Sequence, residues 1–143
     1  MAETITALQK DGHTLVLTSG PDKYEKAMIE KIRALCPSER VYSLAGELTL
    51  RQLAALIDHA KLFIGVDSVP MHMAAALKTP CIALFGPSKL VFWSPWDVVG
   101  EVIWAGNYGE LPDPDKIDTN TKERFLDAIP VDVVVAAARK QLL

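Results

Sequence analysis

Residues 62–88 read LFIGVDSVPMHMAAALKTPCIALFGPS and predict two buried strands with a helix between them. The runs 62–66 and 81–85 are apolar throughout, as is typical of parallel strands that are covered on both faces. Pro70 suits the first turn of the helix, because the N–H group that proline lacks would have no partner there. The residues expected on the buried face of this helix are Met73, Ala74 and Leu77. Strand, helix and second strand together are the unit from which doubly wound sheets are built.

The same alternation of strands and helices continues on both sides of this segment. Upstream, the pattern predicts helices at 2–10 and 23–35, strands at 14–18 and 41–44, and a helix that begins at a capping box formed by Thr49 and Gln52. Downstream, it predicts a weaker strand at 102–104 and a final helix at 131–142, entered through Pro130. The predicted fold class is therefore α/β: a doubly wound, Rossmann-like parallel sheet with helices on both faces.

The length of the chain fits one domain. We divide its 143 residues into a Rossmann-like core at 1–104, an irregular segment at 105–129 and a C-terminal helix at 130–143. An aromatic loop is expected at 92–96. Its Trp93 and Trp96 would either form a platform for a sugar or base, or plug the end of the sheet, which is the more frequent role of such clusters.

Composition excludes several classes of protein. Fifteen Lys and Arg against 18 Asp and Glu give a formal net charge of −3, which argues against binding nucleic acid through bulk charge. No apolar run approaches the roughly 18 residues of a membrane span, and the N-terminus lacks the features of a signal peptide. Cys36 and Cys81 form no CxxC pair, which favours two reduced, buried thiols in the cytoplasm.

The junction at 65–72 carries the most informative polar residues. Asp67 ends a buried strand, Ser68 follows it, and His72 lies in the first turn of the next helix. A helix N-terminus at the carboxyl end of a strand is suited to bind an anion such as a phosphate. Spacing alone leaves a second interpretation equally open, in which Ser68 or Asp67 merely caps the helix and His72 is a partly exposed helical residue.

A second acidic motif superficially matches the DxD sequence with which some sugar transferases hold a divalent ion. It consists of Asp113, Pro114 and Asp115 and lies in a proline-rich segment with no strong strand before it. We interpret it as a solvated turn, and we expect neither a metal ion nor a cofactor.

Four ordered motifs, at 44–53, 62–68, 72–76 and 84–87, resemble the C-terminal half of the ADP-heptose:lipopolysaccharide heptosyltransferases, glycosyltransferase family 9. The Ser-Val-Pro-Met-His form at 68–72 is most similar to the heptosyltransferase III group, which adds a branch heptose to the inner core. The resemblance covers residues 1–104 and the final helix. It implies the C-terminal, donor-binding half of a two-domain GT-B enzyme that inverts the anomeric carbon without a metal ion.

The resemblance assigns donor binding to Asp67, Ser68, Val69, Met71, His72, Glu25 and Leu48. It implies that the backbone N–H groups of Ser68 and Val69 face the diphosphate. Asp67 would bond sugar hydroxyls, and His72 would lie close to the leaving group. Glu25 would contact the ribose and Leu48 would pack on the adenine.

One departure from the family lies within this turn. Most members have glycine where this chain has Val69. A β-branched residue before Pro70 is held in the extended region, so the phosphate turn is not expected to use a positive φ at Val69.

The larger departure concerns the acceptor. The resemblance implies an N-terminal domain, absent from this chain, that carries the general base and binds the lipopolysaccharide inner core. The chain alone is therefore expected to hold no catalytic residue, to bind the ADP-sugar donor weakly and to transfer nothing. The implied location is cytoplasmic, at the inner face of the inner membrane of a Gram-negative bacterium.

A different class of function stays open beside the enzyme. The chain would then be a stand-alone doubly wound module that binds another phosphorylated ligand without catalysis, because this architecture serves many functions. A transferase half is expected to expose apolar surface near its strand ends, whereas a stand-alone module is expected to have a polar surface there.

Overall fold

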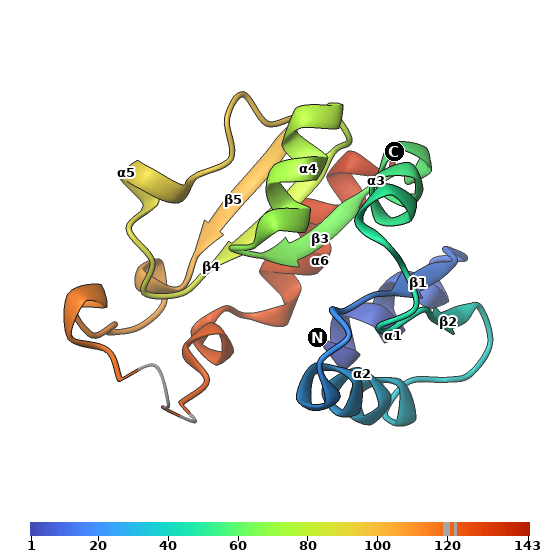
Figure 1. Cartoon of the computed structure of the whole chain (residues 1–143), viewed down its shortest axis with the longest axis horizontal. Coiled ribbons are helices and arrows are strands. Elements are labelled where there is room, and N and C mark those ends of the chain that lie inside the picture. Colours follow the sequence, from blue (N-terminus) through green and yellow to red (C-terminus); the bar gives the residue numbers. More distant parts are fainter. Residues whose placement is uncertain (119–120, 122) are drawn as a thin grey trace. The chain divides into compact units, whose positions relative to one another are not determined.

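A computed structural model describes residues 1–118, 121 and 123–143 of the chain (Figure 1). They form two compact units, Met1–Leu53 and Ala54–Leu143. Both consist of parallel strands with flanking helices, and the predicted α/β fold is confirmed. No helix in the described ranges is long and apolar enough to cross a membrane.

The first unit contains two parallel strands. Its elements are α1 (Ala2–Lys10), β1 (Leu15–Leu17), α2 (Lys23–Ala34) and β2 (Val41–Ser43). Leu15 of β1 is opposite Val41 of β2, and Val41 is buried together with Ile5 and Leu8 of α1. All four elements lie where the sequence predicts them. The apolar stripe of α2 is more exposed than its periodicity suggests, since Met28 is 45% exposed.

Capping fixes where the helices of this part of the chain begin. Asp22 accepts hydrogen bonds through Oδ1 from the N–H groups of Tyr24 and Glu25, at 2.8 and 3.3 Å. The predicted capping box opens α3 (Leu50–His59), which runs from the first unit into the second. In it, the Thr49 N–H donates to Gln52 Oε1 at 2.9 Å, and the Gln52 N–H donates to Thr49 Oγ1 at 3.3 Å.

The second unit is built on a three-stranded parallel sheet in the order β3-β4-β5. Its strands are β3 (Phe63–Val66), β4 (Cys81–Phe85) and β5 (Gly100–Trp104), and its helices are α4 (Val69–Leu77), α5 (Leu90–Trp93) and α6 (Val131–Gln141). The predicted strand, helix and strand at 62–85 are thus present as β3, α4 and β4.

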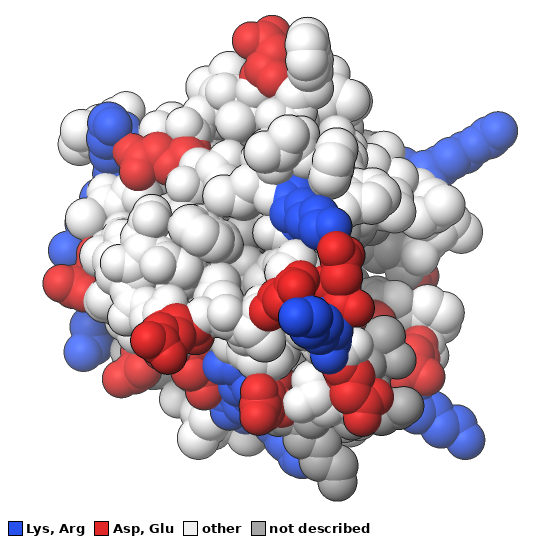
Figure 2. All heavy atoms as spheres, turned by 90° about the vertical axis from the view of Figure 1, so that its left-hand side faces the viewer, with Lys and Arg blue, Asp and Glu red and all other residues white. Residues whose placement is uncertain are grey.

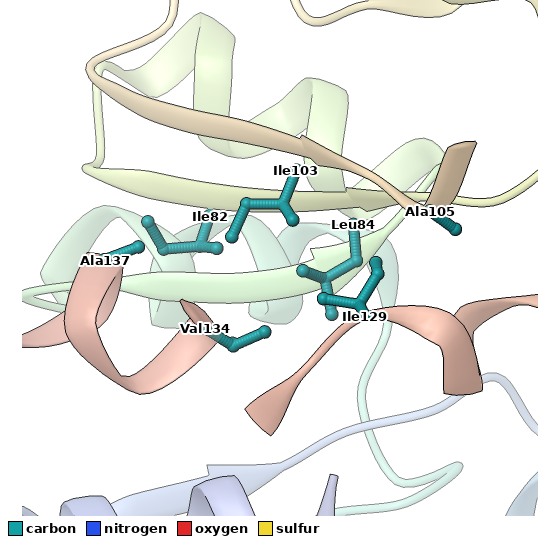
Figure 3. Packing of buried hydrophobic residues seen from close by; sticks show 7 residues of the cluster. All are labelled: Ile82, Leu84, Ile103, Ala105, Ile129, Val134 and Ala137. Carbon is teal, nitrogen blue, oxygen red and sulfur yellow. The ribbon is translucent and has the colours of Figure 1, made fainter. Parts of the chain in front are cut away.

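The central strand β4 is buried along its whole length. Alternate residues point to opposite faces of a sheet, so Ile82 and Leu84 share one face. There they form a cluster with Ile103 of β5 and with Val134 and Ala137 of α6 (Figure 3). The opposite face is covered by α4, which contacts both β3 and β4.

Three features of the second unit differ from the prediction. The strand β3 lies at the edge of its sheet, and its Val66 is 41% exposed, although α4 contacts the strand and Ile64 packs against the core cluster. The buried residues of α4 are Met71, Ala74 and Ala75, whereas Leu77 is exposed. The aromatic loop begins as the short helix α5. The segment at 105–129 contains only short 3₁₀ turns in its described part, in agreement with the expected irregularity.

The two cysteines should differ sharply in reactivity. Cys81 is fully buried in β4, and burial raises the pKa of its thiol to about 11, so little thiolate forms near pH 8. Cys36 is half-buried. We expect Ellman's reagent to modify one thiol in the native chain at pH 8 and both after denaturation. The variant Cys36→Ser should show no fast thiol in the native state, and a fast-reacting thiol in that variant would contradict the burial of Cys81.

Candidate functional site

The carboxyl ends of β3, β4 and β5 meet at one edge of the three-stranded sheet (Figure 1). Three loops leave from this edge, beginning at Asp67, Gly86 and Ala105. Ligands of open parallel sheets bind at this edge. The candidate site of the second unit is therefore built from these loops.

The loop after β3 leads directly into the N-terminus of α4. Its Ser68 is the N-cap residue and has extended backbone, with φ −168° and ψ 165°. The Ser68 hydroxyl does not cap the helix: it donates to the Val66 carbonyl at 2.9 Å, and no side chain among the described residues caps α4. The alternative in which Asp67 or Ser68 serves as a side-chain cap is therefore wrong for this structure.

Because no side chain in the described part of the chain caps the N-terminus of α4, backbone N–H groups there are left without an acceptor from that part. Pro70 has no N–H, and the N–H groups of Met71 and His72 point to the Ser68 carbonyl, at 3.1 and 3.3 Å. Within the described ranges, the N–H groups of Ser68 and Val69 have no protein acceptor. They lie at the positive end of the helix dipole, where an anion is favoured.

Two polar side chains flank these donors. Asp67 is half-buried and His72 is exposed, and neither makes a hydrogen bond or ion pair with the described part of the chain. The imidazole of His72 can donate to an anion. The carboxylate of Asp67 would repel a phosphate, and it is suited instead to accept hydrogen bonds from hydroxyl groups.

The backbone of this turn corrects one detail of the prediction. Val69 is the first residue of α4, and the extended conformation falls one residue earlier, at Ser68. The chain has no positive φ at Val69, as its β-branched side chain requires. The Val69 side chain is 61% exposed.

Met71 differs from the other residues assigned to this turn. Its side chain is fully buried beside Ala74 and Ala75, so it packs in the core and cannot touch a ligand. The donor contact expected of Met71 is therefore wrong for its side chain, whose role is to hold α4 against the sheet.

The remaining two assigned residues belong to the first unit. Glu25 lies in the first turn of α2, and its Oε2 accepts a hydrogen bond of 2.8 Å from the N–H of Gly20, in the loop that follows β1. Leu48 is half-buried in the loop that follows β2. Both residues thus lie after the carboxyl ends of strands, the edge at which ligands of parallel sheets bind.

The second unit also contains an open hollow of about 930 Å³ that the sequence did not reveal. It lies between the loop after β4 and the segment after β5. Its lining includes Ser88, Lys89, Trp104, Gly106 and Glu110. In the sequence, only the position of these two segments after strand ends could have indicated the residues that line the hollow, because segment 105–129 has no periodic pattern.

Exposed apolar side chains lie in the segment between β4 and β5. Val91, Phe92 and Trp93 of α5 are 92%, 72% and 55% exposed, and Trp96 is 87% exposed. The two tryptophans therefore do not plug the sheet. Figure 2, viewed from the α5 side, shows acidic and basic side chains in mixed groups beside large uncharged areas. That this apolar surface borders the strand ends, as the transferase interpretation predicts, stays a prediction.

The acidic motif at 113–115 forms the exposed turn that was predicted. Asp113 Oδ1 accepts a hydrogen bond of 3.0 Å from the N–H of Asp115. Each carboxylate is also paired with a lysine, Asp115 with Lys89 at 2.6 Å and Asp113 with Lys116 at 3.6 Å.

Residues 1–123 match the family described as glycosyltransferase family 9 (heptosyltransferase). The chain belongs to glycosyltransferase family 9. Among its relatives, two proteins named lipopolysaccharide heptosyltransferase 3, both from Escherichia coli, are 49% and 45% identical to it over 96% and 99% of its length. The resemblance to the heptosyltransferase III group is thereby confirmed. This family 9 chain spans 40% of the length of either relative.

Solved structures agree with this membership. A family 9 glycosyltransferase from Veillonella parvula has a TM-score of 0.82 at 24% identity and so supports the fold alone. The E. coli ADP-heptose lipopolysaccharide heptosyltransferase II has a TM-score of 0.75 at 28% identity. In both comparisons the family 9 chain is covered over 99% of its length and matches 40% of the solved chain.

Proposed function

We propose that this chain is the donor-binding part of an inverting heptosyltransferase, which transfers heptose from ADP-heptose to the inner core of lipopolysaccharide. The uncapped N-terminus of α4 carries the proposal, because its free N–H groups follow the carboxyl end of a strand in a family 9 chain. The heptosyltransferase names of its relatives supply the substrate class.

The proposed task of this turn is to stabilise the leaving diphosphate. When the acceptor hydroxyl attacks the anomeric carbon, the bond to the diphosphate breaks and negative charge develops on the ADP that departs. The N–H groups of Ser68 and Val69, the dipole of α4 and the imidazole of His72 would meet that charge without reorganisation. No metal ion is needed in this scheme.

Three further side chains would position the donor. The carboxylate of Asp67 has no protein partner in the described structure and would accept hydrogen bonds from heptose hydroxyls. We propose that Glu25, which the Gly20 N–H holds in place, contacts the ribose, and that Leu48 packs on the adenine.

Most of the acceptor side of the reaction is proposed to lie on a separate acceptor domain. That domain would supply the base that deprotonates the acceptor hydroxyl and would bind the lipopolysaccharide core, at the inner face of the inner membrane. We assign no catalytic base to the described residues of this chain.

Isothermal titration tests the proposal directly. We expect the chain to bind ADP-heptose and ADP with a Kd near ~1 mM, about −4 kcal/mol, and GDP and UDP at least ~10-fold more weakly. Pyrophosphate is the decisive control, because it offers the charge without adenine or sugar. Equal affinity for pyrophosphate, GDP and ADP would favour a module for other phosphorylated ligands and would overturn the heptosyltransferase proposal.

A further inference from the structure

The hollow of about 930 Å³ in the second unit has no role in the donor site described above. Its volume lies at the upper end of the range of small-molecule sites, roughly 300–1,000 Å³. Its walls come from the loop after β4, including Ser88 and Lys89, and from residues 106–114 after β5. It therefore opens at the same edge of the sheet as the turn at 67–72.

Its distance from that turn follows from the sheet. Neighbouring strands lie about 4.8 Å apart, and β4 separates β3 from β5, so the end of β5 lies roughly 10 Å from the end of β3. A short chain of sugar rings can bridge this separation. The hollow begins at the loop after β4, the neighbour of β3, and extends to the segment after β5, so it lies beside the turn at 67–72 and shares no residue with it.

One wall of the hollow is an aromatic ring held in a fixed position. The indole N–H of Trp104 donates to the Gly86 carbonyl at 3.0 Å. The ring also occupies the space that a side chain at residue 106 would need, since a Cβ on Gly106 would lie 2.6 Å from Cε2 and Cη2. A pre-positioned indole offers a surface on which the C–H groups of a sugar ring can pack.

Polar groups are available around this ring. Lys89 Nζ donates to Asp115 Oδ2 at 2.6 Å, on the surface beside the hollow. Ser88 and Glu110 add a hydroxyl and a carboxylate to the lining. Lysine, carboxylate and hydroxyl groups together can donate to and accept from the many hydroxyls of a sugar. The mixed charge favours a polyhydroxylated ligand over a nucleotide.

We propose that this hollow binds a sugar unit of the acceptor oligosaccharide, next to the unit that receives the transferred heptose. The inference deepens the proposed function and rests on it. It assigns part of acceptor recognition to this chain, with Trp104 as the stacking surface and Lys89 as a hydrogen-bond donor.

The test is an NMR titration of the ¹⁵N-labelled chain with core oligosaccharide released from lipopolysaccharide by mild acid hydrolysis. We expect shifts of the Trp104 indole N–H signal and of backbone amides at 86–90 and 106–111. Shifts confined to other residues, or none up to ~10 mM oligosaccharide, would overturn the proposal.

A matched pair of variants tests the polar contact. Lys89→Met should weaken oligosaccharide binding at least ~5-fold, because it removes a donor at the rim of the hollow. Lys78→Met is the control, since Lys78 Nζ is also 2.6 Å from an exposed aspartate, Asp97, and does not line the hollow. Equal weakening in both variants would contradict the role of Lys89.

ADP, titrated into the same sample, separates this inference from the proposed function. Shifts at 67–72 with ADP, but none in the hollow with oligosaccharide, would overturn the acceptor site alone. Oligosaccharide shifts in the hollow without any effect of ADP would support the sugar site and count against the donor site. ADP shifts centred on the hollow would overturn both.

Discussion

Replacing Gly100 by alanine should lower the free energy of unfolding by about 3 kcal/mol or more. Gly100 has φ +133° and begins β5, where it pairs with Cys81 of the central strand. A Cβ at this position would overlap the Cys81 carbonyl oxygen and lie 2.8 Å from its carbonyl carbon. Both contacts are with backbone, so β5 would have to move away from β4.

Urea unfolding followed by circular dichroism measures this effect, and Gly86→Ala is the matched control. Gly86 follows β4 directly, and a Cβ there would meet Phe125 at an ordinary 3.5 Å. The control should stay within about 0.5 kcal/mol of the parent chain. A domain of this size has a total stability of about 5–15 kcal/mol, so an unfolded Gly100→Ala chain would also agree with the prediction. Equal stability of the two variants would contradict it.

Gly100 also belongs to the part of the fold that the sequence patterns did not predict. Long apolar runs such as 81–85 predicted their strands correctly, because burial on both faces requires a continuous apolar sequence. The start of β5 at Gly100 and Glu101 was missed, since neither residue type favours strands. The strong apolar and aromatic character of residues 90–93 did not indicate the short helix α5.

Some features of the candidate site were likewise predictable from the sequence, and others were not. Asp67, Ser68 and His72 were found because a strand end, a hydroxyl and a helix start follow each other in the chain. The direction of the Ser68 hydroxyl was not predictable, because serine can bond several nearby backbone groups with similar energy. The burial of Met71 had a signal, since it shares a helix face with Ala74 and Ala75. The hollow had no signal beyond the position of its walls after strand ends, because the segment after β5 has no periodic pattern.

Replacing His72 or Asp67 should separate the two halves of the donor. His72→Ala should weaken ADP and ADP-heptose binding alike, by at least ~10-fold, because the imidazole is assigned to the diphosphate that both ligands share. Asp67→Ala should weaken ADP-heptose binding at least ~10-fold and leave ADP binding nearly unchanged. Its carboxylate is assigned to sugar hydroxyls, which ADP lacks in the heptose position.

The chain offers matched controls for both variants. Asp58 and His59 lie at the end of α3, both exposed, with His59 Nδ1 3.8 Å from Asp58 Oδ2. Asp58→Ala and His59→Ala should bind both ligands like the parent chain. Ser68→Ala should also have little effect, since the Ser68 hydroxyl is bonded to the Val66 carbonyl and only its backbone N–H is assigned to the phosphate.

NMR-detected titrations measure these affinities in the weak range that is expected. Loss of ADP binding in Ser68→Ala as large as in His72→Ala would mean that side-chain hydroxyls, rather than backbone donors, hold the phosphate. Equal loss of ADP and ADP-heptose in Asp67→Ala would remove the sugar contact from the scheme. Unchanged binding of both ligands in the His72 and the Asp67 variants would contradict the proposed donor site, because these are the two side chains at the N-terminus of α4 that are assigned to the diphosphate and to the heptose.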